Sequence, residues 1–165
     1  MAKESFIACI NKLADILITL PIMADIPYNR PQGRRQYVST AKHQAHSTNK
    51  HSNKWTSVNI ERQVFDIADY GGYDHSNPQV SWTDSNGNMW GFLNGFATVG
   101  LNGEQFGYFE NPNNEVLQWH GFPIIPFSQS RYAICNILLT LWVNSGFFDE
   151  DDIPALLNKK RIRWN

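Results

Sequence analysis

The chain has 165 residues, 42% of them hydrophobic and 18% charged, with a formal net charge of −1. This length suits one domain with its own hydrophobic core, residues 1–165, and the composition excludes an intrinsically disordered chain. No run reaches the roughly 18 uncharged apolar residues that cross a bilayer, so we expect no membrane association.

The first third of the chain predicts one helix and one long irregular segment. Residues 5–20 predict an amphipathic helix, because Phe6, Ile10 and Leu13 recur at helical spacing, and Pro21 ends it. Residues 26–56 predict a basic loop or arm, since Pro, Gly, Ser and Asn are frequent and neither a period of 2 nor one of 3.6 survives. Residues 57–70 alternate in part between apolar and polar side chains and predict a strand or two.

The middle of the chain, from 79 to 127, predicts an antiparallel meander of about five short strands. Asn86-Gly87 and Asn102-Gly103 each join two aromatic-rich runs, and Asn-Gly is the strongest short signal for a hairpin. A third turn at 110–115 leads into the last strand. Four glycines lie in or beside these strands and predict bulges or a tightly curled sheet: Gly91, Gly95, Gly100 and Gly107.

The C-terminal region predicts two further helices. Residues 128–146 form an apolar helical pattern that Ser128 or Ser130 would cap and Gly146 would end. Residues 149–164 predict a short helix with acids in its first turn and cations near its end, as the helix dipole favours. We therefore expect an α+β fold, a curled antiparallel meander packed by an N-terminal helix and a C-terminal helical pair.

The two cysteines, Cys9 and Cys135, both fall in apolar helical patterns. Buried free thiols are the common state at such positions, and free thiols are typical of a reducing compartment. We therefore expect a cytoplasmic protein.

The charge is unevenly distributed. Residues 26–60 hold six Lys and Arg and no acid, so the rest of the chain carries −7, and four consecutive acids stand at 149–152. Charge asymmetry of this kind concerns partners rather than fold. The candidate contacts to a partner protein or a nucleic acid are Arg30, Arg34, Arg35, Lys42, Lys50, Lys54, Asp149, Asp151 and Asp152.

Histidines supply the candidate catalytic groups. His43 and His46 stand among lysines, and two imidazoles with a cation could cleave RNA by acid–base catalysis. With His51 they have the spacing H-x2-H-x4-H, which matches no closed zinc pattern, so we expect no metal. His120 is the first choice for a catalytic histidine, because it ends a predicted strand and a sheet can hold it rigidly. The turn at 69–78, with its acids and His75, we expect to be structural.

Two functions remain open from the sequence alone. The motifs GxGxxG, GxxxxGK[ST], GxSxG, HExxH and CxxC are all absent, so no common enzyme class and no cofactor is expected. The leading hypothesis is a small non-enzymatic protein-binding module of inhibitor or immunity type, which binds a partner protein through charged surfaces. The alternative is a small His-dependent nuclease or nucleic-acid-binding protein of toxin type that binds through residues 26–56.

Overall fold

The computed structural model describes residues 24–114 and 117–163. The helix expected at 5–20, together with Cys9, lies outside the described residues. The rest is an α+β arrangement of antiparallel strands and short helices, as predicted. In chain order the elements are β1 (Ile26–Tyr28), β2 (Tyr37–Ser39), η1 (Ala41–His43), α2 (Val58–Tyr70), β3 (Met89–Phe92), η2 (Asn94–Phe96), β4 (Phe106–Glu110), β5 (His120–Ile124), η3 (Ser130–Tyr132), α3 (Asn136–Asn144) and α4 (Asp152–Leu157).

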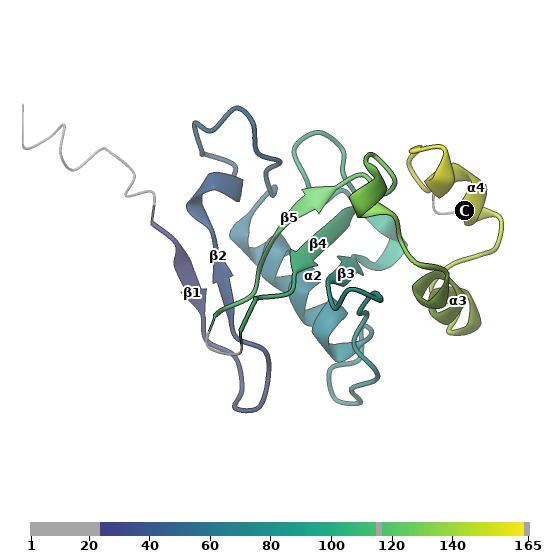
Figure 1. Cartoon of the computed structure of the whole chain (residues 1–165), viewed down its shortest axis with the longest axis horizontal. Helices are drawn as coiled ribbons and strands as arrows, with labels where there is room; N and C mark the ends of the chain where they lie inside the picture. The colour runs from purple at the N-terminus through teal and green to yellow at the C-terminus, as the bar shows by residue number, and fades with distance from the viewer. Residues whose placement is uncertain (1–23, 115–116, 164–165) are drawn as a thin grey trace, which may run out of the picture.

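The central sheet has three strands in the order β3-β4-β5 and is not curled, so the prediction of a curled five-stranded meander was wrong. The Asn86-Gly87 turn is present, but residues 79–84 add only an isolated bridge from Thr83 to Met89 instead of a strand. Two further strands, β1 and β2, form a separate two-stranded sheet. Figure 1 shows this β1–β2 hairpin at one side of the three-stranded sheet and α3 with α4 at the other.

Residues 57–70, expected as strands, form helix α2. Ser57 caps it by accepting a hydrogen bond from the Ile60 N–H at 3.2 Å, and Gly71 ends it with a φ of 70°. Its buried side chains Val64, Phe65 and Ala68 lie on one face at helical spacing. The partial alternation in the sequence was therefore one stripe of an amphipathic helix.

Helix α2 packs closely on the sheet, and this contact explains the strand glycines. A Cβ at Gly91 would lie 2.5 Å from the Val64 carbonyl oxygen, and one at Gly107 would lie 2.8 Å from the Val64 side chain. These glycines let the helix approach the strands and do not mark a curl.

The sheet has a hydrophobic core on each side. On the α2 side, Phe65 and Phe109 pack with Tyr37 and Trp55, which are fully buried. The opposite side is packed by the C-terminal segments, chiefly Leu138 and Trp142 of α3 and Leu156 of α4. The helix predicted at 128–146 is shorter than expected, because η3 and extended residues occupy 130–135, and Cys135 there is a free thiol that is only partly buried.

The expected irregular arm at 26–56 is a packed part of the fold. Its hairpin β1–β2 is joined to the segment before β5, since the Val38 N–H donates to the Trp119 carbonyl and the Trp119 N–H donates to the Gln36 carbonyl, both at 2.9 Å. Trp55, near the end of this segment, is fully buried in the core. Within 24–114 and 117–163, no helix is long and apolar enough to cross a membrane.

Candidate functional site

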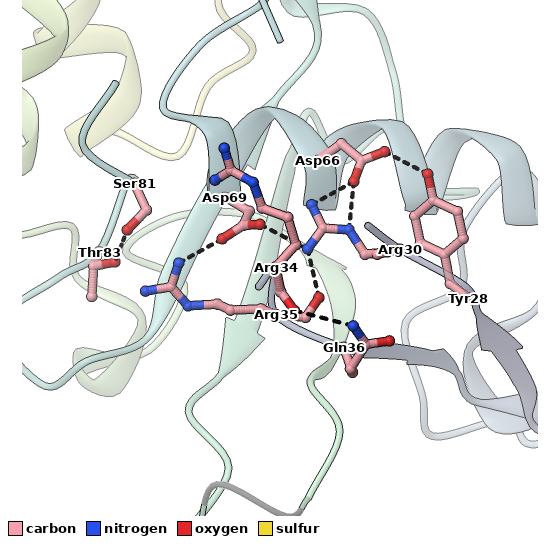
Figure 2. A network of polar contacts seen from close by, with 9 residues as sticks. All are labelled: Tyr28, Arg30, Arg34, Arg35, Gln36, Asp66, Asp69, Ser81 and Thr83. Carbon is pink, nitrogen blue, oxygen red and sulfur yellow. Dashed lines mark hydrogen bonds and ion pairs between the residues drawn. The ribbon is translucent and has the colours of Figure 1, made fainter. Parts of the chain in front are cut away.

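Arg30 and Arg35 of the basic segment lie in an internal network of ion pairs, drawn in Figure 2. The Arg30 side chain is only 1% exposed and pairs with Asp66 at 2.8 Å and with Asp69 at 2.7 Å, both on α2. Arg35 also pairs with Asp69, and Tyr28 donates its hydroxyl to Asp66 at 2.6 Å. The network therefore binds the β1–β2 hairpin to α2. The Arg30 side chain is too deeply buried to contact a partner protein or a nucleic acid.

Arg34 is held by a different contact. Its guanidinium lies 3.9 Å from the centre of the Tyr70 ring, and Tyr70 also stacks on His75 at 4.4 Å. Asp74, in the same turn, accepts hydrogen bonds from the Ser76 backbone N–H and hydroxyl. The contacts of Asp74 and His75 are local, whereas the Arg34 contact joins the segment between β1 and β2 to the last residue of α2.

His43 is a buried structural residue. Its Nδ1 donates to the Asn53 carbonyl at 2.7 Å, and its ring stacks on Phe122 with 5.1 Å between centroids. Burial lowers the pKa of His43 from its ordinary value of 6.5 to about 4, and the positive charge of Lys42 and the neighbouring His120 act in the same direction. The ring is therefore uncharged near neutral pH and cannot supply a proton.

His120 lies opposite an acid on the neighbouring strand. It is the first residue of β5 and pairs in register with Glu110, the last residue of β4, and its Nε2 lies 4.0 Å from the carboxylate. Their side chains are 34% and 47% exposed. Since Gly107 faces α2 and side chains alternate along a strand, Glu110 and His120 point to the opposite face.

Two open hollows share Glu110, one of them also lined by His120, and together they form what we call the Glu110–His120 groove. One, of about 570 Å³, is lined by Tyr108, Glu110 and His120 together with loop amides. The other, of about 420 Å³, shares Glu110 and brings in side chains from η1, β5 and η3. Its charged and aromatic lining consists of Lys42, His43, His51, Phe122, Arg131 and Tyr132.

The groove thus combines an acid, an imidazole, two cations and aromatic walls. Tyr108 is nearly buried, and burial raises its pKa to about 12, so its hydroxyl stays protonated and can donate a hydrogen bond. Among the described residues, neither Lys42 nor Arg131 makes an ion pair. Both cations remain available to an anionic ligand.

The other predicted residues lie outside the groove. His46 and Lys50 are exposed, and Lys54 donates its ammonium to the Ser47 carbonyl at 2.6 Å. Asp149 and Asp151 are exposed, and Asp152 accepts a hydrogen bond from the Asp149 N–H where α4 begins. In the described part of the chain, no group of His, Cys, Asp and Glu could hold a metal ion.

Sequence reasoning missed Glu110 and Arg131. The turn at 110–115 was expected, but the connection between β4 and β5 spans residues 111–119, and its length hides which residue of β4 lies opposite His120. Arg131 was assigned to a helix, and the structure places it in η3 beside the sheet. No protein-family model, no curated protein and no solved structure matches the chain.

Proposed function

We propose that the protein is a small acid–base enzyme that cleaves RNA in the Glu110–His120 groove. The observation that carries this proposal is the pairing of a carboxylate and an imidazole at 4.0 Å on adjacent strands of a rigid sheet. A strand pair holds two such groups in place more precisely than loops do. Lys42 and Arg131 stand in the same groove.

The proposed reaction is an internal transfer within the RNA chain. Glu110 takes the proton of a ribose 2′-hydroxyl, and the 2′-oxygen forms a bond to the adjacent phosphorus. The bond from phosphorus to the 5′-oxygen breaks, and protonated His120 gives its proton to that leaving oxygen. The products are a 2′,3′-cyclic phosphate and a free 5′-hydroxyl, and no water or redox partner is consumed.

The remaining groove residues have roles in this scheme that follow from their chemistry. Lys42 and Arg131 stabilise the extra negative charge of the pentavalent phosphorus. After the reaction, Glu110 holds a proton and His120 lacks one. Because the two groups lie at 4.0 Å, the proton can return to His120 between turnovers. Phe122 is partly exposed and lines the groove, so an unpaired base can pack against it, whereas Tyr132 is buried under the Arg131 guanidinium.

The test compares variants on a labelled oligoribonucleotide and on the same sequence in DNA. His120→Gln and Glu110→Gln should each lower the cleavage rate by about 100-fold or more. Mass spectrometry should show the cyclic phosphate product. DNA should remain intact, because it lacks the 2′-hydroxyl that serves as nucleophile.

His75→Gln is the matched control, since His75 is exposed and stacks on Tyr70 away from the groove. It should cleave RNA at the parent rate, and all variants should keep the parent melting temperature. Equal cleavage of RNA by the parent and the His120 and Glu110 variants would refute the proposal, as would cleavage of DNA.

A second candidate function is the protein-binding module of inhibitor or immunity type. The observation that favours it is the acidic surface at 149–151, whose side chains are exposed and make no ion pair with any residue in the described ranges. Such a surface suits a basic partner protein. A stoichiometric complex that survives nuclease treatment and is lost in Asp149→Lys/Asp151→Lys would support this function.

A further inference from the structure

A run of cations near the C-terminus borders the Glu110–His120 groove. Lys159, Lys160 and Arg161 line a small hollow of about 80 Å³ together with the end of β5 and the residues after it. Ile124, the last residue of β5, lines both this hollow and the groove. The basic run therefore lies next to the groove, at the end of β5 far from His120.

These cations are available for an anionic ligand. Lys159, Lys160 and Arg161 are exposed, and none of them forms an ion pair with another residue of 24–114 or 117–163. Arg161 donates one N–H to the Thr98 hydroxyl at 2.6 Å, which fixes the direction of its guanidinium and leaves its other donors free. The hollow has an apolar floor that includes Ile125, which is 38% exposed.

Lys159 belongs to the turn that ends α4. Its φ is 58°, in the left-handed region, at the position after α4 where glycine is the usual residue. In this turn the Lys159 N–H donates to the Leu156 carbonyl at 3.0 Å and the Lys160 N–H donates to the Ala155 carbonyl at 2.9 Å, so the C-cap of α4 accounts for the left-handed conformation. The same cap holds Lys159 and Lys160 among the residues that line the hollow.

We propose that Lys159, Lys160 and Arg161 form a phosphate-binding track, and that the substrate is a single strand of RNA several nucleotides long. The proposal rests on the proposed function, since the track extends the groove in which RNA would be cut. A strand with its scissile phosphate at His120 would pass Phe122 and Arg131 along β5 and reach the track with its next phosphates. Phe122 favours a single strand, because only an unpaired base can pack against its partly exposed ring.

The test measures binding separately from cleavage. A fluorescein-labelled ten-nucleotide RNA is titrated with protein in the His120→Gln background, and fluorescence anisotropy gives its affinity at several salt concentrations. Lys160→Glu should weaken binding about fivefold or more at 50 mM salt, and it should lower the slope of log affinity against log salt by about 0.7, the value for one lost phosphate contact on a single strand.

Arg163→Glu is the matched control. It makes the same charge change three residues further along, but Arg163 lines a different hollow beside Asp149 and Asp152. It should bind the ten-nucleotide RNA with the parent affinity. Equal affinities of the Lys160→Glu and Arg163→Glu variants would overturn the track, and so would an absence of binding by the parent at 50 mM salt.

Lys159→Gly tests the strain directly. Glycine relieves the left-handed backbone, so the variant should melt about 3 °C higher while binding the RNA more weakly. A higher melting temperature with unchanged affinity would refute a role for Lys159 in binding.

Cleavage assays distinguish failure of the track from failure of the proposed function. On a dinucleotide, which is too short to reach the track, Lys160→Glu should cleave at the parent rate in the His120-containing protein. If binding depends on Lys160 but RNA is never cut, the catalytic proposal fails while the track stands. If RNA is cut but the binding affinity does not depend on Lys160, only the proposal of the track is refuted.

Discussion

Replacing Glu61 by glutamine should change how the stability of the protein depends on pH. Glu61 is fully buried in the first turn of α2 and accepts hydrogen bonds from the Tyr37 hydroxyl at 2.6 Å and the Gln44 amide at 2.7 Å. Burial raises the pKa of Glu61 from its ordinary value of 4.5 to about 7, although both hydrogen bonds act in the opposite direction. The folded protein therefore holds a proton there that the unfolded chain releases.

Because this proton is lost as pH rises, the contribution of Glu61 to the free energy of unfolding falls with rising pH. Its contribution is fully present below pH 4.5 and is lost as pH rises to about 7. Since one pKa unit corresponds to about 1.4 kcal/mol, the loss is about 3 kcal/mol. His43 behaves in the opposite way: its pKa falls to about 4, so its contribution is fully present above pH 6.5 and is lost as pH falls through 4, again by about 3 kcal/mol.

The two effects oppose each other between pH 4.5 and 6.5, so they should largely cancel in the parent protein. In Glu61→Gln only the His43 effect remains, and the free energy of unfolding should rise by about 3 kcal/mol between pH 4 and 6.5. In His43→Asn only the Glu61 effect remains, and the free energy of unfolding should fall by a similar amount between pH 4.5 and 7. In the Glu61→Gln/His43→Asn double variant, both pH-dependent contributions to stability are absent.

Urea unfolding followed by tryptophan fluorescence at half-unit pH steps measures these differences. Each variant is compared with the parent at the same pH, which removes the titration of all other groups. A Glu61→Gln curve that runs parallel to the parent curve from pH 4.5 to 7 would refute the assignment of a bound proton to Glu61.

Two further predictions concern the packing of α2. Asp69→Ala should lower the free energy of unfolding by about 3 kcal/mol in urea unfolding, because the buried Arg30 loses the more deeply buried of its two acidic partners. A loss below 1 kcal/mol would show that the network is not needed for stability. Gly91→Ala should lower the free energy of unfolding by about 2 kcal/mol, because its Cβ would lie 2.5 Å from the Val64 carbonyl oxygen. In Gly103→Ala the added Cβ meets no atom within 4 Å and only the φ of 88° is strained, so this variant separates the effect of a collision from that of strain.

The sequence predicted the elements whose signals are local. Asn86-Gly87 and Asn102-Gly103 are turns, and Gly146 stands in a left-handed conformation after α3, as their residue types require. Helix α2 was missed because Val58 and Ile60, and then Phe65 and Ile67, stand two residues apart, which is the period of a strand over so short a window. The distinguishing signals were Ser57 and Gly71, which mark the two ends of a helix.

The site depended on contacts between distant residues. The basic segment looked irregular because its order comes from outside, through Asp66 and Asp69 on α2 and through the Trp119 backbone. His120 was identified because the sequence placed it at the end of a strand, although β5 in fact begins there, whereas Glu110 required the register between β4 and β5. No local pattern specifies that register across a long connection.

The structure also divides one run of positive charge into two parts with different consequences. Arg30 and Arg35 are paired with acids on α2, so their charges are neutralised within the fold. Lys42 lies on the other face, in the Glu110–His120 groove, without an ion pair among the described residues. The six cations of residues 26–60 therefore overstate the charge that a ligand meets there, and the salt dependence of RNA binding should be set by Lys42, Arg131 and the C-terminal track. Because that set comes from three separate segments of the chain, the binding surface should be lost together with the fold, unlike that of a disordered basic arm.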